Sequence, residues 1–277
     1  MRIGFIVPKD MRAMPFGEAA QWGSENGFAA IDAALEDADI CQEKGIAVGA
    51  THLPANVLTT DEAARERAQE EAFRFIDQAV DKGINRAMIG HARHPDLNAE
   101  ENVELFQQGY APVAEYAEQY DFKLVMEIYH AHGNWLAITP ELIRALFDAV
   151  PSGSLGICLD PSHLVVQGID YIRATREFGE RIFYAHAKDT EILEEELYEY
   201  GILGQALGSN RPFSGWWRYR LPGRGEIDWG RFMGTLAEVG YDDVIAIEHE
   251  DAIWYGDVER NKRGLLLAKK YLDPYIV

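Results

Sequence analysis

The stretch Ser154-Leu-Gly-Ile-Cys-Leu-Asp160-Pro-Ser-His163 carries the clearest information about the fold. It begins as a short apolar run bounded by Gly and Pro, which is typical of a buried strand. Asp160 comes at the carboxyl end of this strand, and Pro161 ends the ladder because it has no N–H to donate. A carboxylate and an imidazole at a buried strand end suit a metal ion better than an apolar core.

Three further stretches are predicted to be strands that end in the same way. Each has an apolar run that ends in ionisable side chains at its carboxyl end. The stretches are Phe122–Glu127, Arg181–Asp189 and Asp243–Asp251. Four buried strands that each end in a ligand-type residue indicate one shared site at one face of a parallel barrel.

The length of 277 residues and the hydrophobic fraction of 47% allow one large core. From Ile3 onward, predicted strands and helices alternate about eight times, without a linker or a low-complexity stretch. We therefore expect a single (β/α)₈ TIM barrel over residues 1–277, with its site at the C-terminal ends of the strands. A doubly wound open sheet is the alternative, and it is disfavoured because polar residues end the strands in both halves of the chain.

Some local expectations are more specific. The third strand is expected as one piece at Ile46–Thr51, after a helix at Ala33–Lys44. The connection after the seventh strand, about residues 190–226, is expected to be an extended loop with an acidic helical piece at Glu191–Tyr200. Trp254 and Tyr255 are expected on an exposed loop that could seal the site of a second copy, so a homo-oligomer is left open.

Composition limits the partners. A formal net charge of −20 disfavours nucleic acid, whose phosphates need a basic surface. No apolar run approaches the roughly 20 residues that cross a bilayer, and Met1–Pro8 is predicted to be a strand and not a signal peptide. Cys41 and Cys158 are expected to be buried thiols. We expect a cytoplasmic protein with a small-molecule carbohydrate substrate and with no nucleic-acid or membrane partner.

Residue type indicates the chemistry of the shared site. Glu127, Asp160, His186 and Glu248 offer three carboxylates and one imidazole. This set of ligands suits Mn²⁺, Mg²⁺ or Co²⁺ better than the sulfur-rich sites of structural zinc do, and Zn²⁺ stays an alternative.

The chain resembles the xylose isomerase-like TIM barrel superfamily, in its sugar phosphate isomerase/epimerase branch. The matching pieces are Met126-Glu127, Leu159-Asp160-Pro-Ser-His163, His186-Ala-Lys188-Asp189, Leu221-Pro-Gly-Arg-Gly225-Glu-Ile-Asp228-Trp229 and Gly240-Tyr-Asp-Asp-Val-Ile-Ala-Ile-Glu248-His-Glu250. They cover most of the second half, whereas the first half matches in plan only. The resemblance implies that Glu127, Asp160, His186 and Glu248 are the metal ligands, and that Glu127 and Glu248 are also the acid/base pair.

This assignment agrees with elementary chemistry. Two carboxylates on opposite sides of a metal can remove and return a proton on either face of a carbon next to a carbonyl, and the metal stabilises the enediolate. The predicted function is therefore a divalent-metal-dependent sugar or keto-sugar isomerase or epimerase, with Mn²⁺ as the favoured metal.

Further side chains are predicted to contact the substrate. His163 and Lys188 follow the ligand residues closely, and the long connection supplies aromatic rings for sugar stacking and guanidinium groups for polar substituents. Purely structural roles are the alternative: a salt bridge for Lys188, and sealing of the loop for its tryptophans. The predicted contacts are His163, Lys188, His52, His91, Trp216, Arg218 and Arg224.

Three other functions are weighed against isomerisation. A lyase or dehydratase acting on a keto-sugar or a 3-keto-glycoside would begin with the same proton abstraction, and the extended loop mildly favours it. An abasic-site endonuclease shares the fold but conflicts with the acidic charge. A ligand-binding subunit without catalysis is disfavoured by the complete set of ligands.

Overall fold

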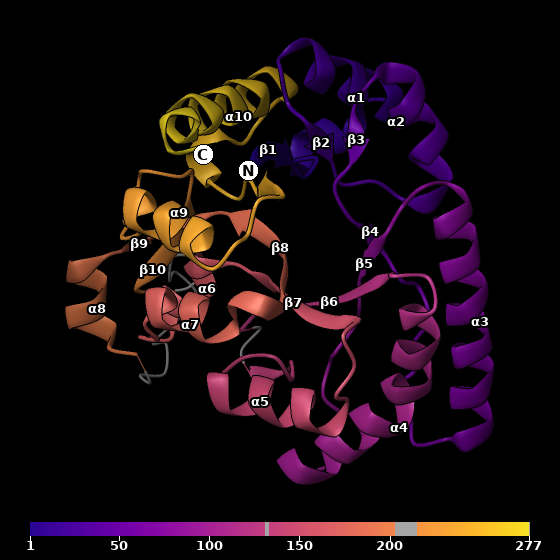
Figure 1. Ribbon diagram of the computed structural model, residues 1–277. Coiled ribbons are helices and arrows are strands. Elements are labelled where there is room, and N and C mark those ends of the chain that lie inside the picture. Colours follow the sequence, from indigo (N-terminus) through magenta and orange to yellow (C-terminus); the bar gives the residue numbers. More distant parts are fainter. Residues whose placement is uncertain (131–132, 203–214, 277) are drawn as a thin grey trace.

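The barrel is built from parallel strands surrounded by helices (Figure 1), and it is seen in a computed structural model that describes residues 1–130, 133–202 and 215–276. The sheet order is β3-β2-β1-β11-β8-β7-β6-β5-β4, and every pair in it is parallel. The predicted single (β/α)₈ TIM barrel is confirmed. Its strands are β1 (Arg2–Phe5), β2 (Ala30–Ile31), β3 (Ala47–Val48), β4 (Thr51–His52), β5 (Arg86–Met88), β6 (Lys123–Glu127), β7 (Leu155–Leu159), β8 (Ile182–Ala187) and β11 (Val244–Ile247).

The third barrel strand is divided, contrary to the prediction of one continuous strand at Ile46–Thr51. β3 pairs with β2 and β4 pairs with β5, and Gly49 and Ala50 lie between them. The cause is a buried pair inside the barrel, in which the Tyr184 hydroxyl donates to Asp32. The Asp32 carboxylate also accepts the Ala50 N–H at 3.2 Å, so it takes the place of a ladder partner.

Replacing Gly49 with alanine is expected to destabilise the fold. An added Cβ would lie 2.4 Å from the Tyr184 hydroxyl oxygen and 2.6 Å from Asp32 Oδ1. Overpacking of this kind lowers the free energy of unfolding by about 1–3 kcal/mol, which urea denaturation would measure. Gly234→Ala is the control, because nothing lies within 4 Å of its added Cβ. Equal stability of the two variants would contradict this explanation of the gap.

Helices cover the outside of the sheet. Local signals set their ends: Asn98 and Glu101 form a capping box at the start of α4, and the Thr139 side chain caps α5, which opens with Pro140. The helices are α1 (Phe16–Glu25), α2 (Ala38–Lys44), α3 (Glu62–Asp81), α4 (Ala99–Glu118), α5 (Pro140–Ala149), α6 (Pro161–Val166), α7 (Tyr171–Phe178), α8 (Glu194–Tyr200), α9 (Trp229–Glu238) and α10 (Val258–Leu272). Within the described ranges, none of them is both long and apolar enough to span a membrane.

Two of the predicted helices begin later than expected. The segment predicted as a helix from Ala33 first forms a short 3-10 turn at Leu35–Asp37, and the α-helix follows from Ala38. The acidic helix predicted from Glu191 begins at Glu194, because Glu191 belongs to a strand. Local composition therefore located both helices but not their first residues.

The long connection after β8 contains ordered structure that the sequence prediction treated as a loop. Strands β9 (Asp189–Ile192) and β10 (Trp217–Arg220) pair antiparallel, with Tyr219 opposite Thr190. Residues 203–214 of the connection lie outside the described residues. These two strands form an arm, and side chains of this arm lie at the carboxyl-terminal end of the barrel strands.

Trp254 and Tyr255 are not exposed as predicted, because both are half-buried. Trp254 packs against the main core, and Tyr255 stacks on His249 with ring centroids 5.7 Å apart. Both rings thus make contacts within the chain.

Candidate metal centre

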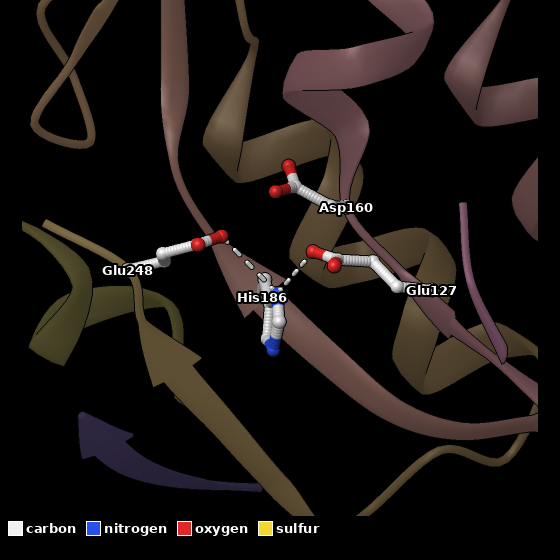
Figure 2. Close-up of side chains that lie close together, drawn as sticks. All are labelled: Glu127, Asp160, His186 and Glu248. Carbon is white, nitrogen blue, oxygen red and sulfur yellow. Dashed lines mark hydrogen bonds and ion pairs between the residues drawn. The ribbon is translucent and has the colours of Figure 1, made fainter. Parts of the chain in front are cut away.

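Four ionisable side chains converge because they share one strand parity. The residues Val125, Cys158, Tyr184 and Ala246 all fill the barrel interior. Two positions later along their strands come Glu127, Asp160, His186 and Glu248. Successive side chains of a strand alternate between its faces, so these four also point inward, one layer nearer the C-terminal end. Their strands are neighbours in the order β11-β8-β7-β6, which brings the four side chains together (Figure 2).

The cluster is tight. One potential ligand atom from each of the four residues lies within 4.8 Å of all the others. His186 Nδ1 lies 3.0 Å from Glu127 Oε1 and 3.3 Å from Glu248 Oε2. Figure 2 shows the two glutamates reaching His186 from opposite sides, with Asp160 across from the ring. The predicted ligand residues are therefore adjacent in space.

The chemistry of this donor set fits a divalent cation. Burial raises the pKa of Asp160 to about 6, since a wholly buried carboxylate is costly without a compensating positive charge. Asp160 Oδ2 is buried without a hydrogen-bond partner in the described ranges, although Lys188 Nζ lies 3.2 Å from that oxygen. Ligands at about 2.1 Å from an ion lie up to about 4.2 Å apart, so the observed 4.8 Å requires only a small closure.

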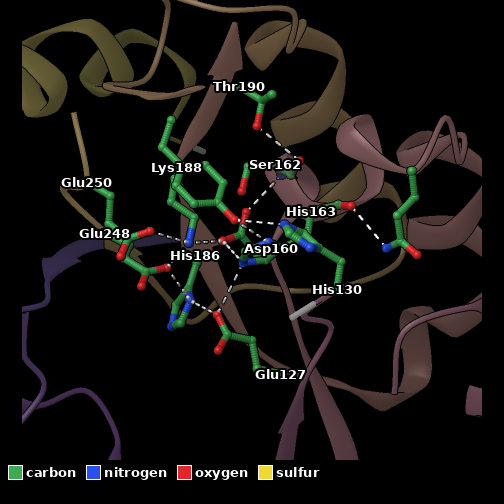
Figure 3. Close-up of polar contacts among 12 residues, drawn as sticks. Glu127, His130, Asp160, Ser162, His163, His186, Lys188, Thr190, Glu248 and Glu250 are labelled. Atoms are coloured by element: carbon green, nitrogen blue, oxygen red, sulfur yellow. Dashed lines mark hydrogen bonds and ion pairs between the residues drawn. The ribbon is translucent and has the colours of Figure 1, made fainter. Parts of the chain in front are cut away.

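Lys188 is the cation that the cluster already contains. It is 1% exposed, and its Nζ lies 2.6 Å from Glu248 Oε2 and 3.3 Å from Glu250 Oε2 (Figure 3). Burial alone would lower the pKa of this ammonium, but Glu248 and the neighbouring carboxylates outweigh burial and hold the pKa well above its usual value. Burial likewise raises the pKa of Glu248, yet Lys188 and His186 bring it well below its usual value. Glu248 is therefore ionised at neutral pH.

His163 also faces the cluster. It follows Asp160 in the first turn of α6, and its Nε2 lies 3.4 Å from Asp160 Oδ2. Its other nitrogen, Nδ1, lies 2.9 Å from the Tyr219 hydroxyl, which also lies 3.1 Å from His130 Nε2. Burial holds the pKa of His163 well below its usual value, so the ring is neutral and can donate from one nitrogen only. Tyr219 thus anchors the side of His163 that points away from the cluster.

Replacing Tyr219 with phenylalanine is expected to weaken this anchor and the fold. The variant keeps the ring but leaves the buried Nδ1 of His163 without its partner. An unsatisfied buried polar group costs about 1–3 kcal/mol of the free energy of unfolding, which urea denaturation would measure. Tyr198→Phe is the control, because Tyr198 is 88% exposed. Unchanged stability of Tyr219→Phe would show that the hydroxyl is dispensable.

Comparison with known proteins places this geometry in a family. A model of the xylose isomerase-like TIM barrel matches residues 11–271. The chain belongs to this family. The resemblance seen in the sequence motifs is thereby confirmed, and it extends over the first half of the chain as well.

The chain is also similar in sequence to curated proteins. The uncharacterized protein YfiH of Bacillus subtilis is 34% identical over 118 residues, which are 42% of this chain and 37% of YfiH. Inosose dehydratase of Bacillus licheniformis is 26% identical over 202 residues, which are 72% of this chain and 61% of the dehydratase. The similarity thus spans less than two thirds of either relative.

Solved structures share the fold at low sequence identity. D-psicose 3-epimerase of Clostridium cellulolyticum H10 superposes with a TM-score of 0.76 and 14% identity, covering 100% of this chain and 99% of the epimerase. The IOLI protein, solved with a bound zinc atom, gives a TM-score of 0.70 and 17% identity, covering 99% and 96% of the two chains. At these identities the likeness shows that the fold is shared.

The two histidines predicted from early strand ends lie in different surroundings. His52 ends β4 and is exposed, and it lines a cavity of about 410 Å³ together with Asp32. His91 is fully buried; its Nδ1 accepts the Ala137 N–H at 3.3 Å, and burial lowers its pKa to about 3. His52 is thus accessible to a ligand, whereas His91 is enclosed by other residues of the protein.

The residues predicted from the long connection are also divided. Trp216 is half-buried and lines a cavity together with His130. Arg218 is exposed and is paired with Glu191 across the arm at 2.6 Å. Arg224 lies on an exposed turn, where its N–H donates to Leu221 O at 3.1 Å. The structure brings neither arginine into contact with the four-residue cluster.

Two residues gain importance that the sequence reasoning did not assign to them. Glu250 pairs with Lys188, and its parity with Glu248 was a usable signal for that position. Tyr219 is one of the aromatic rings of the long connection that were expected to stack on a sugar, whereas its hydroxyl contacts two histidines. No local signal could have indicated this, because the contact depends on how the β9–β10 arm folds back.

Proposed function

We propose that this chain is a divalent-metal-dependent enzyme that moves a proton on the carbon next to the carbonyl of a sugar or keto-sugar, as an isomerase or epimerase. The observation that carries the proposal is the placement of Glu127 and Glu248 on opposite sides of a buried Asp–His pair (Figure 2). Two opposed carboxylates can serve the two faces of one carbon, which both isomerisation and epimerisation require.

The residues of the cluster would have two roles, metal binding and proton transfer. Glu127, Asp160, His186 and Glu248 would hold the cation, with Mn²⁺ favoured and Mg²⁺, Co²⁺ or Zn²⁺ as alternatives. Such a cation supplies Lewis acidity, which polarises the substrate carbonyl and favours loss of the neighbouring proton. Glu248 is kept ionised by Lys188, so it can accept a proton at neutral pH.

The substrate would lie against the remaining polar groups at the barrel mouth. His163 offers a ring nitrogen that is buried without a hydrogen-bond partner among the described residues. Lys188, His52 and Trp216 complete the proposed contacts. A neutral His163 that donates from Nε2 would bind a substrate oxygen, because Tyr219 occupies its other nitrogen.

A lyase or dehydratase is the second candidate. Its support is the similarity to an inosose dehydratase, at 26% identity over 202 residues. In that reaction Glu248 would remove the same proton, but a group on the next carbon would leave before the proton could return.

Deuterium uptake from D₂O separates these candidates. The Mn²⁺-loaded protein would be incubated with ketoses, inososes and 3-keto-glycosides, and the products would be identified by mass spectrometry. Deuterium in a rearranged sugar of unchanged skeleton is the expected result. Loss of water or of an aglycone would establish the lyase instead. No uptake by any compound, with metal content verified, would overturn the proposal.

A further inference from the structure

A further cavity, of about 210 Å³, opens beside Glu248. One wall is the segment that follows β1, with Lys9 and Arg12 on its short 3-10 helix (Lys9–Ala13). The other wall follows β11 and contains Glu248, Glu250 and Tyr255. Glu248 also belongs to the four-residue cluster, so the cavity and the cluster share this residue.

The charges of the two basic residues in this cavity are not neutralised by an acidic side chain of the described residues. Lys9 and Arg12 are exposed, and neither forms an ion pair within the described part of the chain. Arg12 Nε donates to Val7 O at 3.3 Å, and Lys9 Nζ lies 6.0 Å from the Tyr255 ring centroid. The protein has 46 acidic and 26 basic residues, so unpaired cations in one cavity are not explained by a shortage of partners.

The two acidic residues of the cavity form ion pairs with Lys188. Lys188 Nζ lies 2.6 Å from Glu248 and 3.3 Å from Glu250, on the side toward the cluster (Figure 3). A cation held by the cluster would add further positive charge next to Glu248. Among the described residues the two glutamates thus pair with Lys188 and not with Lys9 or Arg12, which remain available to an anionic ligand.

A buried histidine also lines the cavity. His249 lines it and is only 3% exposed, and neither of its ring nitrogens has a hydrogen-bond partner among the described residues. Buried polar groups in native proteins are almost always paired, so this ring lacks a partner that a ligand or a water molecule would supply.

We propose that this cavity is an anion subsite, in which Lys9 and Arg12 bind a phosphate or carboxylate group of the substrate. This inference rests on the proposed function and narrows it, since the substrate becomes a phosphorylated keto-sugar or a keto-sugar acid. Both anions have the same chemistry toward a guanidinium and an ammonium. The reacting carbon would lie at the cluster, and the anionic group at the far end of the same molecule would occupy the cavity.

Three ketoses that differ only at one end provide the test: fructose, fructose 6-phosphate and fructuronate, with the corresponding tagatose series for the other stereochemistry. Calorimetry on the Mn²⁺-loaded protein would measure the three dissociation constants. At least one anionic ketose is expected to bind about tenfold or more tightly than the neutral one, since charge-assisted hydrogen bonds contribute more than neutral ones. Preference for the phosphate alone or the carboxylate alone identifies which anion the subsite takes.

Charge-reversal variants connect that preference to the cavity. Arg12→Glu and Lys9→Glu are expected to bring anionic ketoses down to the affinity of the neutral one, whose own affinity stays constant. Lys270→Glu is the matched control, because it makes the same charge change at an exposed position on α10 and should keep the preference. Equal binding of neutral and anionic ketoses, or no binding of any, would overturn the subsite, as would a preference that survives both variants.

The same compounds distinguish failure of the subsite from failure of the proposed reaction. Deuterium uptake by neutral and anionic ketoses at equal rates and affinities would leave the enzyme in place and remove the subsite. Tight, Arg12-dependent binding of an anionic ketose without deuterium uptake would keep the subsite and remove the proton transfer.

Discussion

Replacing Glu248 with glutamine is expected to lower kcat about 10²–10⁴-fold, the contribution typical of a positioned general base. Glutamine has nearly the same shape, but its neutral amide cannot accept the proton. It also removes the carboxylate that lies 2.6 Å from the buried Lys188 ammonium. The measurement is the rate of deuterium uptake by the substrate that the panel identifies, at saturating Mn²⁺.

Metal content must be measured in the same samples, because Glu248 is also a proposed ligand. Elemental analysis that finds full metal with lost turnover would separate proton transfer from metal binding. Glu195→Gln is the matched control, since Glu195 is exposed on α8 and should retain full activity. A Glu248→Gln variant with near-normal turnover would remove this residue from the mechanism.

Replacing Asp160 with asparagine is expected to abolish most metal binding without unfolding the protein. Asp160 caps α6 by accepting the Ser162 N–H at 2.9 Å, and asparagine can keep this cap. The substitution removes the negative charge of this fully buried ligand, and a divalent cation needs that charge in order to bind. The measurements are metal content and the rise in Tm on adding Mn²⁺, which reflects about 2.7 kcal/mol at a hundredfold excess over Kd in the wild type.

A second capping aspartate provides the control for that variant. Asp170 caps α7 by accepting the Ile172 and Arg173 N–H groups at 2.9 and 3.0 Å, and it lies outside the cluster. Asp170→Asn should therefore leave metal content unchanged. Asp160→Ala should lose metal and, in addition, about 1 kcal/mol from the broken cap. Full metal content in Asp160→Asn would mean that the four-residue set is not the metal site.

The sequence by itself was sufficient for the barrel and for the four-residue cluster. Apolar runs that end in Glu127, Asp160, His186 and Glu248 located the strands, and the two-residue period of a strand determined which side each residue faces. Because parallel strands present their carboxyl ends at one face of a barrel, position along the strand already implied that these residues meet. Both signals are local, so they could be read before any contact was known.

Only the tertiary structure decided which group each side chain meets. The break at Gly49 follows from Tyr184 and Asp32, which come from distant strands. The contact of Tyr219 with His163 follows from the way the β9–β10 arm folds back. Periodicity states which face a residue occupies, but partners across a barrel depend on packing between segments far apart in the chain. For that reason the sequence indicated a site for a cation with Lys188 near it. The folded chain was needed to reveal that Lys188 pairs with Glu248 and Glu250, and that Lys9 and Arg12 lie beside the site without an ion pair among the described residues.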